Sequence, residues 1–204
     1  EGEALGIFAP QETASELDLA CYAFGQNFNV TPISLIAAQA ACINGGYLYQ
    51  PHVVEQVRDS SGAVVYQHDN TPLRQVVSQQ TSATARECLE YVVSDGGGRN
   101  GQVKGYRIGG KTGTTDDARD RYFAGFTPYY CAAAWSGYKS NEVVYSDTNP
   151  CSAMFKRVMS RIHEGLEDPG FHSCDGLVDV TVCADSGLLA TEACAADFRG
   201  SRVK

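Results

Sequence analysis

The chain has 204 residues, of which 43% are hydrophobic and 20% are charged, and this ordinary balance excludes a wholly disordered chain. Its formal net charge of -8 argues against a nucleic-acid partner, because nucleic-acid binding needs a basic surface. The longest apolar stretch, residues 29–46, is interrupted by Thr31, Pro32, Ser34 and Gln39. It therefore predicts an ordinary helix and no membrane span.

The N-terminal third of the chain predicts one helix and one hairpin. Residues 1–20 lack apolar periodicity, and we expect them to run over the surface without regular structure. Residues 31–43 predict a helix, because a threonine that can cap precedes a proline suited to the first helical position. Two strand-like runs, residues 52–59 and 63–68, are joined by a Ser-Ser-Gly link and predict a β-hairpin.

The remaining elements predict an α+β fold. Residues 79–93 predict a second helix. Residues 106–115, 121–128 and 129–138 have strand-like alternation and short links, so they predict an antiparallel sheet packed with helices. Residues 150–164 predict a last helix on the sheet. The apolar residues expected on its inner face are Phe155, Val158, Met159 and Ile162.

A domain boundary is predicted near residues 165–170, where one proline and two glycines cluster. It separates a main domain, residues 1–165, from a small C-terminal β extension, residues 166–204, with a short strand, a turn and an extended return. Cys183 and Cys194 bracket that turn. A disulfide between them would stabilise the extension by roughly 3 kcal/mol in an oxidising compartment.

The cysteines and histidines predict no metal site. None of the eight cysteines forms a C-x-x-C pair, which argues against a zinc ribbon or a thioredoxin-type site. Cys21, Cys42 and Cys88 lie in apolar-periodic segments and are expected to be buried. The histidines lack the spacing of metal ligands. They are His52, His68, His163 and His172.

The stretch RIGGKTGTTDDARDRYFAGFTP, residues 107–128, places a cation beside hydroxyl groups. Lys111 offers a positive charge, and Thr112 and Thr114 offer hydroxyl donors. In a regular strand Lys111 and Gly113 share one face and the two threonines share the other. Such a set suits a carboxylate, and the strand backbone suits an extended peptide. The glycines expected to leave room for a ligand or another backbone are Gly109, Gly110 and Gly113.

Residues 111–114, K-T-G-T, match the third signature motif of penicillin-binding proteins and serine β-lactamases. Residues 30–54 resemble the transpeptidase segment of penicillin-binding proteins, with V-T-P-x-x-L, then N-G-G, then P-x-x-V, a pattern that β-lactamases lack. Residues 123–138 resemble the two strands that follow the motif. Residues 176–194 resemble the C-terminal extension of bifunctional class A members, whereas residues 18–32 resemble monofunctional class B members, so the subclass stays open.

The resemblance implies a partial β-lactamase/transpeptidase-like fold at the extracytoplasmic face of the bacterial cell membrane. In that family a serine acyl-enzyme forms from a D-Ala-D-Ala stem peptide of peptidoglycan, and β-lactams bind the same site. Carried over to this chain, the resemblance implies that Lys111 adds positive potential as a catalytic residue. It also implies that Thr112, Gly113 and Thr114 form the substrate-binding wall, without a cofactor.

The family's nucleophile motif is missing from this chain. The family has a serine and a lysine in S-x-x-K well before K-T-G, with an S-x-N motif between the two. Here S-x-x-K occurs only at residues 136–139 and 201–204, both after K-T-G, and S-x-N does not occur. We therefore expect no turnover by this chain alone. We expect the other half of the transpeptidase domain to be its partner.

Three interpretations of the sequence remain. The chain is a C-terminal portion of a transpeptidase whose other half lies elsewhere, or it is a non-catalytic module that binds peptidoglycan peptides. The third interpretation is a structural or interaction protein in which Lys111 has no role. The sequence GGKTGTT, residues 109–115, counts against the third interpretation.

Overall fold

A computed structural model of the chain describes residues 6–10, 12–171, 178, 180–183 and 186–195. The chain divides into two compact units, residues 1–173 and 174–204. The division falls shortly after the region in which the sequence predicts a boundary, residues 165–170. The predicted sheet and the helices around it all belong to the larger unit.

The larger unit contains a three-stranded antiparallel sheet. Its strands are β5 (Gly109–Thr114), β6 (Asp120–Phe126) and β7 (Cys131–Gly137), in the order β5-β6-β7. Lys111 pairs with Ala124 across the first two strands, without a bulge between them. Strands β5 and β7 are a few residues shorter than the predicted segments, and β6 begins one residue earlier and ends two residues earlier than predicted. The predicted combination of helices with an antiparallel sheet is confirmed.

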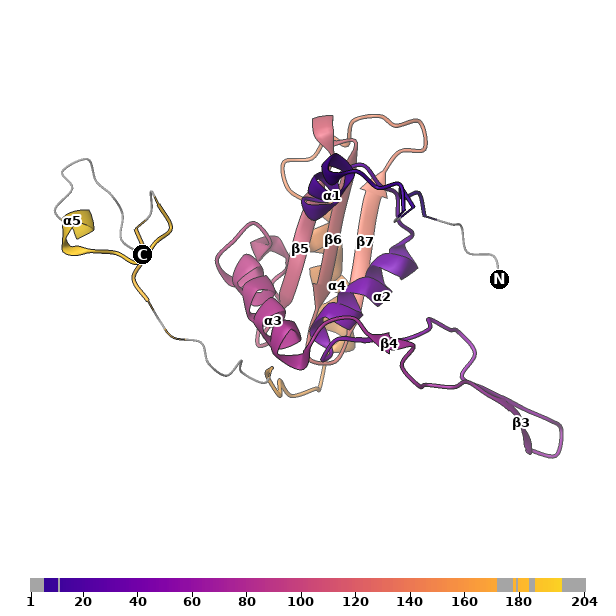
Figure 1. Cartoon of the computed structure of the whole chain (residues 1–204). Helices are drawn as coiled ribbons and strands as arrows, with labels where there is room; N and C mark the ends of the chain where they lie inside the picture. The colour runs from indigo at the N-terminus through magenta and orange to yellow at the C-terminus, as the bar shows by residue number, and fades with distance from the viewer. Residues whose placement is uncertain (1–5, 11, 172–177, 179, 184–185, 196–204) are drawn as a thin grey trace. The chain divides into compact units, whose positions relative to one another are not determined.

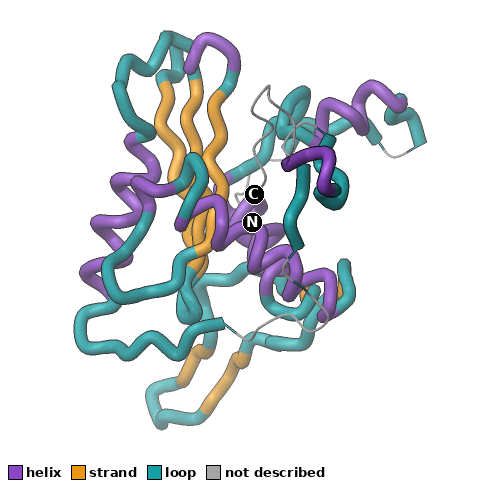
Figure 2. Tube along the Cα trace, turned by 90° about the vertical axis from the view of Figure 1, so that its left-hand side faces the viewer, coloured by secondary structure: helices purple, strands orange, loops and turns teal. Residues whose placement is uncertain are grey.

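Helices lie on both sides of this sheet (Figure 2). Helix α2 (Pro32–Ile43) packs against β7 and crosses in front of the sheet in Figure 1, and α4 (Pro150–Ile162) packs against β6 and β7 from behind. Helix α3 (Gln79–Ser94) packs against β5. Each helix begins after a residue whose side chain accepts a backbone N–H of the first turn. These caps are Thr31, Ser78 and Asn149. In the described part of the chain, no helix combines the length and the apolar character needed to cross a bilayer.

The core lies between the sheet and α4. Phe123 is fully buried, and its ring meets that of Phe155 edge to face, with centroids 5.0 Å apart. Met159, one turn after Phe155, is also buried. The prediction was wrong for Val158 and Ile162, whose exposed fractions are 48% and 46%. Val158 lies at the flank of the buried stripe and Ile162 is the last helical residue, so apolar spacing alone overestimated the inner face.

One helix was not expected. Helix α1 (Glu16–Ala23) occupies part of the segment predicted to be irregular, residues 1–20. None of its residues is buried, and its sequence shows no apolar face at helical spacing. The signal that was present is its capping box, in which Ser15 and Asp18 bond each other's backbone N–H.

Two short ribbons complete the larger unit. Strands β2 (Gln56–Arg58) and β3 (Val64–Gln67) form the predicted hairpin, and all of their residues are exposed. Strands β1 (Tyr47–Leu48) and β4 (Arg74–Gln75) form a second antiparallel pair. Single-turn helices η1 (Arg99–Gly101) and η2 (Asp116–Ala118) precede β5 and β6.

The expected burial of the cysteines was wrong at two positions. Cys42 and Cys88 are exposed, while Cys21 is half-buried. Helix α2 is apolar around most of its circumference and buries only Ala41, so its periodicity could not identify the inner face. Helix α3 is mostly polar, and its buried residues are Ser82 and Val93, so Cys88 lies away from its inner face.

The smaller unit is described in part. Val182 pairs with Leu189 across a turn, in line with the predicted strand and return, and a short helix, α5 (Glu192–Ala195), follows. The structure has no bond between the sulfur atoms of Cys183 and Cys194. Instead, the N–H of Thr191 donates to Sγ of Cys194 at 3.5 Å. The disulfide, which is expected only in an oxidising compartment, stays a prediction.

Candidate functional site

Strand β5 separates the residues of the K-T-G-T motif between its two faces. Lys111 pairs with Ala124 and Gly113 pairs with Tyr122, so these residues share one face of the sheet. Thr112 pairs with Phe123, which is part of the core on the opposite face. The alternation expected from the sequence is present.

The outer edge of β5 offers unpaired backbone groups. The N–H of Thr115 donates to the carbonyl of Asp120 at 3.1 Å, which marks a hydrogen-bonded pair of the ladder. Such pairs alternate along antiparallel strands, so the N–H and C=O groups of Thr112 and Thr114 point away from β6. No strand among the described residues covers that edge. The ammonium of Lys111 donates to the carbonyl of Thr112 at 2.8 Å, which agrees with this orientation.

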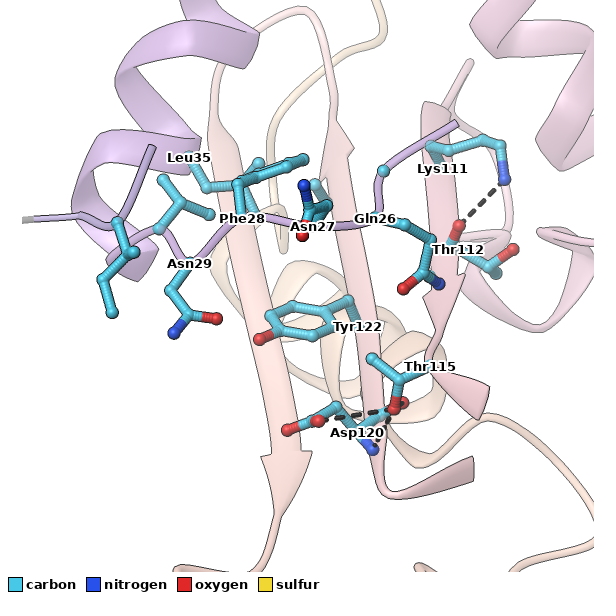
Figure 3. Close-up of a pocket in the computed structure, with 15 residues that line it drawn as sticks. Gln26, Asn27, Phe28, Asn29, Leu35, Lys111, Thr112, Thr115, Asp120 and Tyr122 are labelled. Atoms are coloured by element: carbon cyan, nitrogen blue, oxygen red, sulfur yellow. Dashed lines mark hydrogen bonds between the residues drawn. The ribbon is translucent and has the colours of Figure 1, made fainter. Parts of the chain in front are cut away.

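A cavity of about 590 Å³ lies on the Lys111 face. The sheet supplies one wall with Lys111, Gly113, Tyr122 and Ala124, and Figure 3 shows how the labelled side chains surround the space. The other lining residues come from β5 and the residue after it, from the start of β6, from α2 and from the N-terminal segment. They are Thr112, Thr115, Asp120, Leu35, Ile7, Gly25, Gln26, Asn27, Phe28, Asn29 and Val30.

The second wall of the cavity is residues 25–30, which an aromatic cluster holds in place. Phe28 stacks on Phe8 with ring centroids 5.2 Å apart, and Tyr22 meets Phe28 edge to face. Asn29 exchanges two backbone hydrogen bonds with Ile7 at 2.9 and 3.0 Å. The wall is therefore fixed by contacts with segments distant in sequence.

The end of the cavity away from Lys111 is formed by Asp120 and its partners. The indole of Trp135 donates to Oδ1 of Asp120 at 2.8 Å, and the hydroxyl of Thr115 lies 3.3 Å from Oδ2. The backbone N–H of Asp120 donates to the hydroxyl oxygen of Thr115 at 2.8 Å. Burial, with Asp120 as a smaller cause, raises the pKa of Tyr122, so its hydroxyl stays a neutral donor.

The glycines of the motif do not all serve the cavity. A Cβ on Gly109 would lie 2.1 Å from the ring of Phe126, and a Cβ on Gly110 would lie 2.9 Å from the ring of Phe123. These two glycines are buried. Gly109 admits an aromatic ring, and Gly110 also lies close to the backbone of Ala124 and Gly125, which is one of the two alternatives, a ligand or another backbone, that the sequence predicted. Gly113 does line the cavity, as expected.

The structure brings together only part of the predicted set. Lys111 is exposed and lines the cavity with Thr112 and Gly113, whereas Thr114 lies outside the lining and presents its backbone at the strand edge. Tyr122 and Asp120 were missed, although strand pairing through the predicted turn would have placed both on the Lys111 face. Gln26 and Asn29 carried no comparable signal, because their position depends on long-range contacts.

The family comparison agrees with this architecture. The penicillin binding protein transpeptidase domain family matches residues 1–147, more than half of the chain. The chain belongs to this family. Stage V sporulation protein D of Bacillus subtilis (strain 168) is 41% identical over 138 residues, which are 63% of the chain and 21% of that protein. Penicillin-binding protein 1A of Clostridium perfringens (strain ATCC 13124) is 34% identical over 161 residues, 78% of the chain and 19% of that protein.

The fold is also that of a solved transpeptidase-family structure. Penicillin binding protein 3 from Mycobacterium tuberculosis superposes with a TM-score of 0.71 at 21% identity, over 93% of this chain and 45% of that chain. This transpeptidase-family chain spans about a fifth of the length of the two curated relatives. The β-lactamase/transpeptidase-like fold expected from the sequence is thus confirmed for the part of the domain that the chain represents.

Proposed function

We propose that this chain supplies the substrate-binding wall of a D,D-transpeptidase that cross-links peptidoglycan stem peptides by serine acyl transfer. The observation that carries the proposal is the arrangement at β5. Lys111 lines a cavity, and its ammonium donates to the carbonyl of Thr112 at a strand edge where the N–H groups of Thr112 and Thr114 point outward. A cation suits the terminal carboxylate of a D-Ala-D-Ala peptide or of a β-lactam, and the edge suits its extended backbone.

The proposed roles follow from these positions. Lys111 adds positive potential where the carboxylate and the reacting carbonyl lie. The resemblance to the family gives Thr112 and Thr114 a part in binding the carboxylate. Their side chains share the sheet face opposite Lys111, so this role falls to their outward N–H groups at the strand edge. One outward N–H of β5 stabilises the oxyanion together with a donor from the nucleophile's own segment. Gly113 lets the substrate approach the strand closely.

This chain does not supply the nucleophile in the proposal. Ser136 lies within β7, Lys139 follows the end of that strand, and residues 201–204 lie outside the described residues. The serine and its activating lysine therefore belong to another part of a longer protein or to a partner chain. Loss of such a nucleophile costs about 10⁶-fold in rate, so we expect the chain alone to be inactive. Its site of action would be the extracytoplasmic face of the cell membrane, where peptidoglycan is cross-linked.

A second candidate is a non-catalytic module that holds peptidoglycan peptides. It is favoured by the presence of Lys111 at the cavity, which suits a carboxylate whether or not a nucleophile is supplied. The two candidates differ in one respect: a transpeptidase portion regains acylation when the missing half is supplied, and a binding module does not.

The test combines covalent labelling with non-covalent binding. Purified chain is incubated with a fluorescent penicillin and analysed by mass spectrometry, and we expect no adduct. Binding of diacetyl-L-Lys-D-Ala-D-Ala is measured by NMR titration for the wild type, Lys111→Ala and the control Lys104→Ala, which alters an exposed lysine outside the cavity. We expect only Lys111→Ala to weaken binding. Equal binding by all three proteins would remove the anion site.

A further inference from the structure

The turn between β5 and β6 has an unfavourable backbone conformation. Asp117 and Ala118 both have positive φ angles, 58° and 55°. Two such residues in succession are typical of a tight type I′ turn, in which the second of them is normally a glycine. The Cβ of an alanine clashes with the backbone in the left-handed region. Ala118 therefore keeps this conformation only because contacts from elsewhere hold it there.

The contacts that hold the turn come from the β7–α4 loop, residues 138–149. Because β7 runs antiparallel to β6, this loop starts at the end of the sheet where β6 begins (Figure 1). The N–H of Val144, a buried residue of the loop, donates to the carbonyl of Ala118 at 2.9 Å. The guanidinium of Arg119 donates to the carbonyl of Asn141. The loop thus bonds the strained residue and the residue that follows it.

The turn connects two residues that form one end of the cavity beside Lys111. Thr115 follows β5, Asp120 begins β6, and both line the cavity. The N–H of Asp120 donates to the hydroxyl oxygen of Thr115 at 2.8 Å, and Figure 3 shows the two residues joined by dashed lines. Only residues 116–119 lie between them, so a change in the turn moves one against the other. The conformation of the turn therefore sets the shape of this end of the cavity.

We propose that Arg119 is a positioning residue: together with the β7–α4 loop it holds Ala118 in the left-handed region. Thr115 and Asp120 are thereby fixed at the end of the cavity. The inference goes beyond the proposed function, because it gives control of the cavity to a loop that does not line it. The strain lies beside a binding cavity, where a fixed geometry is useful. In contrast, the β2–β3 hairpin has a glycine, Gly62, at the positive φ of its turn, and no such strain arises.

The first experiment measures the turn without a ligand. Trp135 is the single tryptophan of the chain, and its indole donates to Asp120 at 2.8 Å, so its emission reports on this end of the cavity. Arg119→Met should shift the Trp135 emission. It should also speed hydrogen exchange of the Val144 N–H about tenfold, because the turn loses one of its two bonds to the loop. No change in either readout would overturn the role of Arg119.

Two further variants separate positioning from the loss of any surface arginine. Arg119→Lys keeps a cationic donor and should restore most of the wild-type emission and exchange rate. Arg58→Met is the matched control, because Arg58 is also exposed and donates to a turn carbonyl, that of Gly62, at 3.0 Å. It lies outside the cavity lining and should change neither readout. The same change in Arg58→Met as in Arg119→Met would overturn the inference.

Ala118→Gly tests the strain itself. A glycine adopts the left-handed conformation readily, so the variant should melt about 2–4 °C above the wild type. It should also reduce the effect of Arg119→Met on the Trp135 emission, because the turn then keeps its conformation without the loop. A melting temperature that does not rise, or an equal effect of Arg119→Met in both backgrounds, would overturn the inference.

A binding measurement connects this inference with the proposed function, on which this one arm rests. Diacetyl-L-Lys-D-Ala-D-Ala should bind Arg119→Met about three- to tenfold more weakly than the wild type, and Arg119→Lys should recover most of the affinity. Wild-type affinity in Arg119→Met, with a shifted Trp135 emission, would show that the turn does not shape the site and would overturn the inference. Absence of binding by the wild type would contradict the proposed function, and the emission and exchange readouts would still decide the role of Arg119.

Discussion

The two faces of the β5-β6-β7 sheet differ in how completely they are covered. On one face, Phe123 packs against Phe155 and Met159 of α4, and all three side chains are buried. On the other face, Lys111 and Tyr122 border a cavity of about 590 Å³. Neighbouring residues of one strand thus have different tasks, because alternate side chains point to opposite faces. The Phe123 side, here the covered face, stabilises the fold. The Lys111 side, here the open face, borders the cavity.

The largest expected effect tests the covered face. Phe155→Ala should lower the free energy of unfolding by about 3–5 kcal/mol, because it removes a buried ring and leaves a cavity against Phe123. The matched variant is Leu35→Ala, which truncates a half-buried side chain at the open cavity. We expect it to cost less than half as much, because less apolar surface is buried there. Urea denaturation measures both, and equal losses would contradict the difference between the faces.

A second prediction marks where the open face ends. Gly109→Ala should destabilise the protein by about 1–3 kcal/mol, because its Cβ would lie 2.1 Å from the buried ring of Phe126. Gly113→Ala, on the same face of the same strand, should cost less, because its Cβ would lie 3.2 Å from Cβ of Tyr122. Thermal unfolding of the two variants provides the measurement. A larger loss for Gly113→Ala would show that the covered part of this face extends along the whole strand.

The sequence predicts the sheet well, because local patterns determine it. Strand alternation and the short link between the predicted segments 106–115 and 121–128 were enough to place β5 and β6. The K-T-G-T motif pointed to Lys111, which lines the cavity. The same alternation assigned Thr112 to the face opposite Lys111. Asp120 was within reach of this reasoning, since counting back from the turn pairs it with Thr115.

The rest of the site depends on contacts that no local pattern reveals. Residues 25–30 form a wall of the cavity only because Phe28 packs with Phe8 and Tyr22. Helix α1 buries no residue, so only its capping box marks it in the sequence. Helix α2 is apolar on several sides, and the burial of Cys42 could not be judged from its spacing. In each case tertiary packing, and not periodicity, decides which side chains face inward.

Helix α3 carries a partly buried carboxylate, Glu90. Its Oε2 accepts from the guanidinium of Arg107 at 2.6 and 2.7 Å. Its Oε1 is buried, and no group in the described part of the chain donates to it. Burial raises the pKa of Glu90 above its ordinary value of 4.5, and Arg107 opposes this shift only in part. An ionised carboxylate at Glu90 is therefore less favourable than one in water.

The smallest expected effect is the pH dependence that Glu90 causes. Between pH 4.5 and its raised pKa, the folded state binds more protons at Glu90 than the unfolded state does, so stability should fall as the pH rises through this window. Glu90→Gln removes the titrating group and should flatten that part of the curve of unfolding free energy against pH. Glu164→Gln, at an exposed position, should keep the wild-type slope. An unchanged slope in Glu90→Gln would mean that Arg107 compensates the buried charge of Glu90 fully, so that burial costs this carboxylate nothing.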